Sequence, residues 1–281
     1  MKLVRFGPRG RERPGVLGAD GAVRDVSARI ADFTPGFFAG DWRGALDRAL
    51  DGAPAHPVDP ALRFGVPLAG VSKIVGLGMN YHAGVRRAGM VMPTEPLLFI
   101  KSATCLAGPS DPILLPPGSE KLDWEVELAV VIGREASRLE PGEVPDAILG
   151  YCVFNDLSER HWQNERGGEW CKGKSADGFG PCGPWIATAD EIGDANRLDI
   201  WLTLDGTRYQ ASNTSDMIFS VEYAVGYISQ FMRLLPGDIV IMGTPPGTGQ
   251  RQTPQRFLRP GDRLSLGIAG LGEQNAEILA G

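Results

Sequence analysis

The sequence DWEVELAVVIG, residues 123–133, decides the fold of this chain, because it alternates with the two-residue period of a β-strand. Glu125 and Glu127 fall together on one face, and apolar residues such as Val126 fall on the other. The β-branched residues around the pair predict a buried strand. Two adjacent buried carboxylates must become protonated, meet cations or bind a metal, and oxygen ligands suit Mg²⁺, Mn²⁺ or Ca²⁺. The alternative is a polar strand face in contact with water.

Composition excludes several classes of function. The chain has 281 residues and a formal net charge of −6, and it contains neither a basic run nor an apolar run of membrane-helix length. We therefore expect no nucleic acid and no membrane as a partner. The N-terminus lacks the apolar core of a signal peptide, and the four cysteines lack the paired short spacing of a zinc site. These features predict reduced thiols in a cytoplasmic protein.

The turn signals predict the domain organisation. Thirty-eight glycines and 22 prolines imply many turns and short strands. Residues 1–65 are predicted to form a small N-terminal domain, with a hairpin turning at Asp20-Gly21 and a helix over residues 42–50. A linker is expected over residues 51–60, and residues 66–281 are assigned to a larger main domain.

The main domain is predicted to open with a strand over residues 73–81. Gly76 and Gly78 suggest a dinucleotide-binding loop, but Tyr81 occupies the place of the third glycine and excludes it. The polar segment 82–92 is either a mobile lid over a site or a surface loop. A second buried strand is expected over residues 97–101.

Further polar residues follow the predicted strands. A strand over residues 150–156 ends in Asp156, and a helix after it would bring Asp156, Arg160 and Gln163 onto one face. That face suits metal ligation with substrate contact, although a helix N-cap with an ion pair is the alternative. Lys174 is either a group that stabilises an enolate or a surface charge. The loop around Thr244 either binds a carboxylate or is a plain turn.

Taken together, several motifs resemble the fumarylacetoacetate hydrolase family, particularly its bacterial members related to 2,4-diketo-3-deoxy-sugar-acid hydrolases and acylpyruvases. The resemblance runs from about Lys73 to the C-terminus, and the order and spacing of the motifs make it specific. The motifs are Gly78-Met79-Asn80-Tyr81, Glu125-Val126-Glu127, Asn155-Asp156, Ser158-Glu159-Arg160 with Gln163, Lys174-Ser175, residues 213–219, and Gly243-Thr244-Pro245-Pro246-Gly247.

The resemblance implies a fold, a metal and a substrate class. The implied fold is of the α+β class, a mixed and mainly β roll with few helices and a small N-terminal domain, and the implied assembly is a homodimer. Mg²⁺ or Mn²⁺ would be held by Glu125, Glu127 and Asp156, and the substrate would be a small 2-oxo or 2,4-dioxo acid. The remaining residues that the resemblance implies are Lys174 near the enolate, and Arg160, Gln163, Thr244 and Tyr81 in contact with the substrate.

One departure from the family pattern bears on the reaction. Family hydrolases carry a His and a Glu that activate water at the third and sixth positions after the tyrosine, where this chain has Gly84 and Arg87. His82 is the candidate replacement for the catalytic base, and Arg86 with Arg87 could instead bind a distal carboxylate. Three functions therefore stay open: a metal-dependent hydrolase of C–C bonds, an isomerase or decarboxylase on the same site, and an inactive relative that only binds a ligand.

Overall fold

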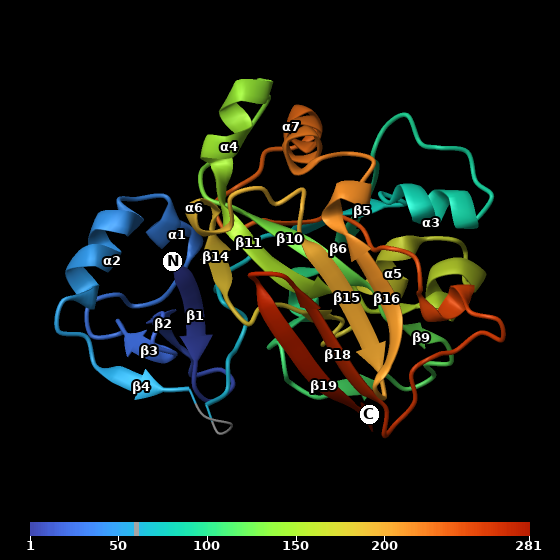
Figure 1. The fold of residues 1–281 in the computed structure, drawn as a ribbon, viewed down its shortest axis with the longest axis horizontal. Helices are drawn as coiled ribbons and strands as arrows, with labels where there is room; N and C mark the ends of the chain where they lie inside the picture. The colour runs from blue at the N-terminus through green and yellow to red at the C-terminus, as the bar shows by residue number, and fades with distance from the viewer. Residues whose placement is uncertain (59–61) are drawn as a thin grey trace.

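A ten-stranded sheet runs through the computed structural model, which describes residues 1–58 and 62–281 (Figure 1). Strand β10 lies in its interior, antiparallel to both neighbours, and each of its seven residues is buried. The strands in spatial order are β4 (Ala55–Pro57), β3 (Ala22–Asp25), β2 (Arg13–Leu17), β1 (Lys2–Phe6), β14 (Ile186–Thr188), β11 (Ile148–Asn155), β10 (Val126–Ile132), β17 (Ile239–Ile241), β5 (Ile74–Gly78) and β6 (Leu97–Lys101).

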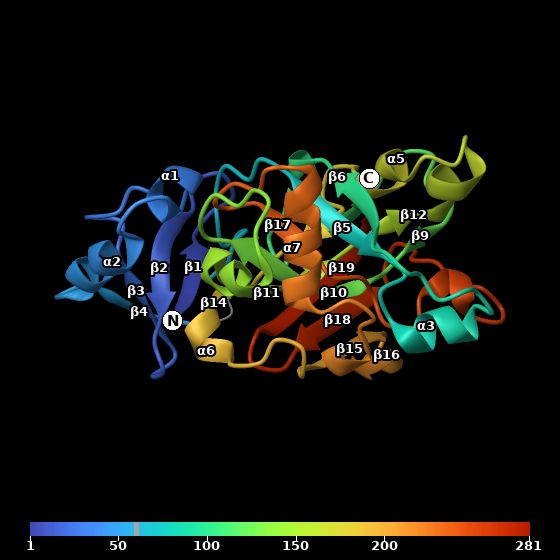
Figure 2. The same ribbon diagram turned by 90° about the horizontal axis from the view of Figure 1, so that it is seen from above.

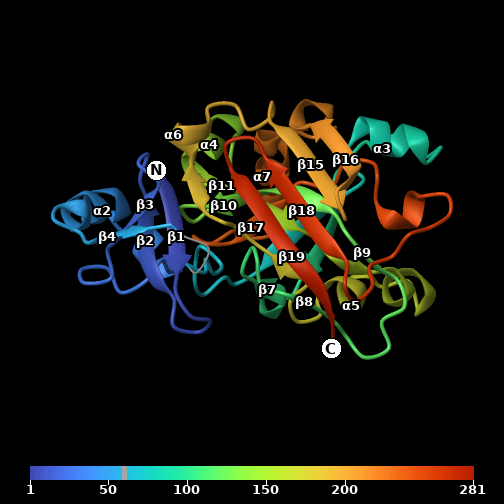
Figure 3. The same cartoon turned by 60° about the horizontal axis from the view of Figure 1, so that its bottom comes forward.

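A five-stranded sheet packs against the first, with β15 and β18 on β10 and β19 on β11 (Figure 3). Its order is β16 (Thr207–Asn213), β15 (Asp199–Leu204), β18 (Arg263–Ile268), β19 (Gly272–Ala280) and β8 (Ile113–Leu115). Two small ladders pair β9 (Leu122–Asp123) with β12 (Ser158–Glu159) and β7 (Leu106–Ala107) with β13 (Gly180–Pro181). The predicted α+β class, a mixed and mainly β roll, is confirmed.

The helices are short and lie around the sheets. Helix α7 crosses the face of the large sheet over β10, β11 and β17 (Figure 2). Among the described residues, none of the helices combines the length and the apolar character that a bilayer span needs. The helices are α1 (Pro35–Phe38), α2 (Trp42–Leu50), α3 (His82–Arg87), α4 (Val144–Ala147), α5 (Trp170–Lys174), α6 (Ala189–Ile192) and α7 (Val221–Phe231), with 3₁₀ turns η1 (Ala103–Cys105), η2 (Pro141–Glu143), η4 (Thr214–Asp216) and η5 (Gly249–Arg251), and one π-helical turn, η3 (His161–Glu165).

The N-terminal strands are continuous with the main sheet. β1 pairs with β14, so backbone hydrogen bonding crosses the predicted boundary at residue 65. The expected linker is wrong in part, because residues 55–57 form β4 by pairing with β3, and the end of that linker, residues 59–60, lies outside the described residues. The independence of residues 1–65 as a domain stays a prediction.

Local sequence signals place several of these elements correctly. The hairpin of β2 and β3 turns through Asp20-Gly21, and α2 covers the predicted residues. Ser220 caps α7 by accepting a hydrogen bond from the Tyr223 backbone N–H at 3.2 Å. All four cysteines are free thiols, as predicted. The large core beneath α7 fixes β10 and β11, whose ends supply the acids described next.

Candidate metal centre and its cavity

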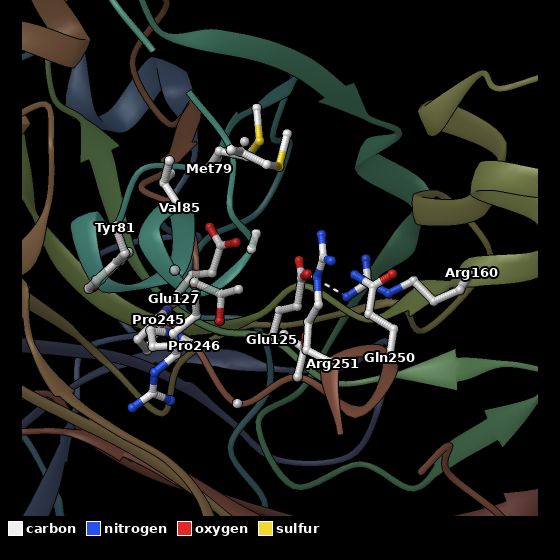
Figure 4. A pocket seen from close by; sticks show the side chains of 18 of the residues that line it. Met79, Tyr81, Val85, Glu125, Glu127, Arg160, Pro245, Pro246, Gln250 and Arg251 are labelled. Carbon is white, nitrogen blue, oxygen red and sulfur yellow. Dashed lines mark hydrogen bonds and ion pairs between the residues drawn. The ribbon is translucent and has the colours of Figure 1, made fainter. Parts of the chain in front are cut away.

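A cavity of about 610 Å³ opens at the end of the large sheet where β5 leads into α3. Its floor is formed by the start of β10 and by α5, and its far wall is formed by the loop over residues 244–252 (Figure 4). Met79 lines it in the left-handed backbone region, with a φ of 55°. Unfavourable backbone conformations of this kind cluster at functional sites, which makes the cavity a candidate functional site.

Three carboxylates meet at this floor and just beneath it. Glu125, Glu127 and Asp156 each offer an oxygen within 4.8 Å of the other two, and the three residues are 8%, 1% and 0% exposed. Antiparallel pairing of β10 with β11 sets Val126 opposite Asn155, so the two glutamates flank the strand end that Asp156 follows. The side-chain alternation predicted from the sequence therefore brings the implied ligands together.

Three buried cations surround the acids. The Lys174 ammonium bridges Glu125, at 2.8 Å, and Asp156. The Lys101 ammonium donates to Asp156 Oδ1 at 2.6 Å, and Arg160 pairs with Glu125 at 2.5 Å. Such pairs compensate for the lost hydration of the charges. Burial opposes the ionisation of Glu125, but the charges of Arg160 and Lys174 outweigh it and lower the pKa of Glu125 to about 2.

Glu127 differs from the other two acids. Its carboxylate accepts the Gly243 backbone N–H at 2.7 Å, and no cation pairs with it among the described residues. Burial, together with the charges of Asp156 and Glu125, holds the pKa of Glu127 well above its usual range. With Asp123, which also pairs with Arg160, four buried carboxylates face three buried cations. The deficit of positive charge at Glu127 is what a hard divalent cation would supply, so the residues present fit Mg²⁺ or Mn²⁺.

The predicted helical face of Asp156, Arg160 and Gln163 is wrong. Residues 158–159 form β12 against β9, and the Arg160 backbone N–H donates to Lys121 O at 3.0 Å instead of to the residue four positions before it. Arg160 therefore points at Asp123, at 2.9 Å, and at Glu125. Its third contact, a 2.9 Å donation to Gln163 Oε1, does bring the predicted substrate residues Arg160 and Gln163 together in the cavity.

Two members of this cluster were not predicted. Lys101 is the last residue of β6 and is 0% exposed. The sequence signal for its role was a lysine at the end of an otherwise apolar strand, because a lysine is rarely buried without a partner. Asp123 opens the quoted stretch, and its carboxylate accepts the backbone N–H groups of Gly249 and Gln250 as well as pairing with Arg160. Nothing in the strand alternation distinguished it. Lys101 holds Asp156, and Asp123 holds Arg160, which faces the cavity.

Tyr81 and Thr244, two of the other predicted residues, line the cavity. The Tyr81 hydroxyl is buried with no hydrogen-bond partner among the described residues, and burial followed by the Glu127 charge raises its pKa. The Thr244 hydroxyl donates to Val126 O at 2.9 Å and accepts from Gln210 Nε2 at 2.8 Å. Its proton is therefore engaged, and a carboxylate would have to compete for it.

The segment 82–92, predicted as a lid or a loop, begins as helix α3. Gly84 and Arg87, the residues at the positions of the family's water-activating pair, both line the cavity. His82, the candidate replacement base, is the first residue of α3 and is not among the described residues that line it. The structure therefore does not bring His82 together with the other candidates.

Comparison with known proteins agrees with this geometry. Residues 73–279 match the model of the fumarylacetoacetate (FAA) hydrolase C-terminal domain. The chain belongs to the fumarylacetoacetate hydrolase family. A Burkholderia lata protein named only "Putative hydrolase" is 48% identical over 275 residues, which cover 98% of this chain and 97% of that one.

Solved structures of the family align along the whole chain. The fumarylacetoacetate hydrolase of Exiguobacterium antarcticum has a TM-score of 0.88 at 30% identity, with 100% of both chains covered. The maleylpyruvate hydrolase of Sphingobium sp. SYK-6, in complex with manganese(II) and pyruvate, has a TM-score of 0.83 at 28% identity, also with 100% of both covered. The 5-carboxymethyl-2-hydroxymuconate delta-isomerase of Mycobacterium smegmatis has a TM-score of 0.80 at 29% identity, with 100% of this chain and 99% of that chain covered. The family thus includes both hydrolases and isomerases.

Proposed function

We propose that this protein is a divalent-metal-dependent enzyme whose substrate is a 2-oxo or 2,4-dioxo acid. One observation carries the proposal: Asp156, just beneath the floor of the cavity, converges with Glu125 and Glu127, which line it, and Glu127 has no cation partner among the described residues. A relative that only binds a ligand would gain nothing from burying one more carboxylate than cations, because burying an unpaired carboxylate is costly. The manganese in the Sphingobium structure supports the same assignment.

A bound Mg²⁺ or Mn²⁺ would supply Lewis-acid chemistry at the oxo and carboxylate oxygens of the substrate. The chain's own residues would then control charge and position. The Lys174 ammonium, already between Glu125 and Asp156, would face negative charge that develops on the substrate. The unpartnered Tyr81 hydroxyl and the Arg160–Gln163 pair would orient the substrate, since they line the same cavity within the described part of the chain.

The first candidate reaction is hydrolysis of a C–C bond in a 2,4-dioxo acid of the acylpyruvate or diketo-sugar-acid type. It is supported by the likeness to the fumarylacetoacetate and maleylpyruvate hydrolases. In this reaction a water must lose a proton, and the two carbon fragments must separate with negative charge on the 2-oxo acid side.

The second candidate is isomerisation or decarboxylation of a 2-oxo or 2-hydroxy-diene dicarboxylic acid. It is favoured by a specific feature of the cavity: the described lining residues include no histidine, and their only carboxylates are Glu125 and Glu127. Gly84 cannot accept a proton, and Arg87 stays protonated, so neither can activate water. Neither of these reactions consumes an activated water. The delta-isomerase among the related structures fits this candidate.

A product-resolved assay separates the candidates. The protein is incubated with Mg²⁺, and then with EDTA, on an acylpyruvate, a 2,4-diketo-3-deoxy sugar acid, oxaloacetate and a hydroxy-diene dioate. Release of two acids that stops with EDTA would establish hydrolysis, whereas carbon dioxide or an isomer without cleavage would establish the second candidate. Metal-independent turnover, or no turnover of any of the four, would count against the proposed function.

A further inference from the structure

A buried glutamine joins the five-stranded sheet to the floor of the cavity. Gln210, in the edge strand β16, is 0% exposed and is not among the described residues that line the cavity. Its Oε1 accepts the Val126 backbone N–H at 3.2 Å, and its Nε2 donates to Thr244 Oγ1 at 2.8 Å and to Pro245 O at 2.7 Å. Burying an amide is costly unless it is hydrogen-bonded, and these bonds lead to residues around the candidate metal centre.

Val126 lies between the two glutamates of the floor, so the position of its backbone decides where their side chains begin. On one side β11 holds it, because Val126 pairs with Asn155. On the other side the pairing of β10 with β17 covers residues 129–131 and ends short of Val126. Side chains take over at this point. Gln210 accepts the Val126 N–H, and the Thr244 hydroxyl donates to Val126 O at 2.9 Å.

The same glutamine also fixes the far wall of the cavity. The first two residues of the loop over residues 244–252 both accept hydrogen bonds from Gln210 Nε2. This loop packs directly on β16, because a Cβ at Gly247, whose φ is 120°, would lie 2.0 Å from Tyr209 O. Gln210 therefore links the wall loop to the strand that carries the two glutamates.

We propose that Gln210 is a positioning residue, which holds the backbone of Val126 and the wall loop in the arrangement that the metal centre needs. This inference rests on the proposed function, because it gives Gln210 a part in metal binding. Gln210 acts through Val126 and Thr244, since it does not itself line the described cavity. A strand end held on both sides keeps the carboxylates of Glu125 and Glu127 in place before the cation arrives, and such preorganisation strengthens binding.

The test is Mn²⁺ binding by the full chain in the absence of substrate, measured by calorimetry. Gln210→Met keeps the length of the side chain and removes its three hydrogen bonds. The Mn²⁺ dissociation constant should rise at least about tenfold, because groups that orient metal ligands typically contribute 10–100-fold to affinity. Hydrogen exchange at the Val126 N–H should also speed up, since Gln210 Oε1 is its acceptor.

Gln274→Met is the matched control. Gln274 is 1% exposed, and its Nε2 donates to the backbone carbonyls of Val153, Pro181 and Gly183. None of these residues is in the described lining of the cavity. Gln274→Met should unfold at a lower urea concentration than the wild type, as Gln210→Met should, because each variant removes the partner of buried polar groups. Its Mn²⁺ dissociation constant should stay within about twofold of the wild-type value.

A second variant tests the same network if Gln210→Met does not fold. Thr244→Val removes, at a half-buried position, the hydroxyl that links Gln210 to Val126 O. It should weaken Mn²⁺ binding by about threefold or more without substrate present. Wild-type Mn²⁺ affinity in Gln210→Met or in Thr244→Val, or an equal loss of affinity in Gln274→Met, would each overturn the inference. If the wild type itself binds no Mn²⁺, the proposed function fails instead.

Discussion

At the floor of the cavity, Glu127 is 1% exposed, and the acids beside it are held by lysine and arginine side chains that are themselves buried. At the mouth, α3 presents Arg87 to solvent, and the ion pair from Arg86 of this helix to Asp216 spans 3.7 Å. Most charged side chains at the floor are therefore held by buried ion pairs, whereas those at the mouth are exposed and weakly paired. On the proposed function, the floor would hold the metal, whereas side chains at the mouth are less constrained by partners.

The largest expected effect comes from Glu127→Gln, which removes the unpaired charge from the floor. Turnover should fall by roughly a thousandfold or more, because metal-dependent catalysis loses a ligand. Unfolding by urea without metal should show no loss of stability, because the variant removes an uncompensated buried charge. Glu120→Gln, at an exposed side chain, is the control. Near-normal turnover by the Glu127→Gln variant would refute the assignment of the floor.

Lys101→Met should lower the stability of the fold, which Glu127→Gln should not. It removes the cation that donates to Asp156 at 2.6 Å from a site where both side chains are 0% exposed. Breaking such a pair by removing one partner costs about 3–5 kcal/mol. Denaturant unfolding measures the loss, and adding Asp156→Asn should recover part of it. Lys121→Met, which disrupts a pair near the surface, should have little effect. If the Lys101→Met variant unfolds at the same denaturant concentration as the wild type, the pair between Lys101 and Asp156 does not stabilise the floor as we describe.

A third prediction changes the mouth. Gly84→His with Arg87→Glu restores the family's two residue types, and a Cβ at Gly84 would have only ordinary contact, 3.8 Å from Tyr81 Cβ. Hydrolysis of acetylpyruvate, which has no distal carboxylate, should rise at least about tenfold, since general acid–base catalysis contributes roughly 10²–10⁴. Gly84→Asn with Arg87→Gln keeps similar shapes without the titrating groups. The absence of any gain over that control would show that these positions do not govern water activation.

The smallest expected effect concerns the attachment of α3. Asp216 accepts the Ala83 backbone N–H at 2.9 Å, so it caps a helix whose own N-cap residue, Tyr81, makes no side-chain cap among the described residues. Asp216→Asn should cost about 1 kcal/mol or less. Hydrogen exchange should speed up over residues 82–88, with unchanged exchange in β10. Faster exchange in β10 as well would show that floor and mouth are not independent.

Much of the fold could be predicted where local pattern and tertiary packing agree. The alternation around Glu125 and Glu127 predicted a buried strand, and Asp20-Gly21 predicted the turn between β2 and β3. The path after Asp156 could not be predicted this way, because β12 forms by pairing with β9 and this pairing overrides the local helical spacing. Strand propensity carries no information about such distant partners.

The site was also predictable only in part. The alternation placed Glu125 beside Glu127, and the family resemblance added Asp156, so the convergence of the three acids was expected. Lys101 and Asp123 escaped because their roles depend on contacts with Asp156 and Arg160 that only the folded sheet creates. His82 shows the converse: a suitable residue type two positions from the expected place lies away from the described cavity lining. On a helix such as α3, a shift of two positions turns a side chain by about 200° around the axis.

The most direct test of the central claim, a divalent cation at Glu125, Glu127 and Asp156, is a Mn²⁺ titration of the EDTA-treated protein followed by electron paramagnetic resonance. Our account predicts one bound Mn²⁺ per wild-type chain and at least about tenfold weaker binding by Glu127→Gln. No binding by the wild type, or equal binding by the variant, would contradict it.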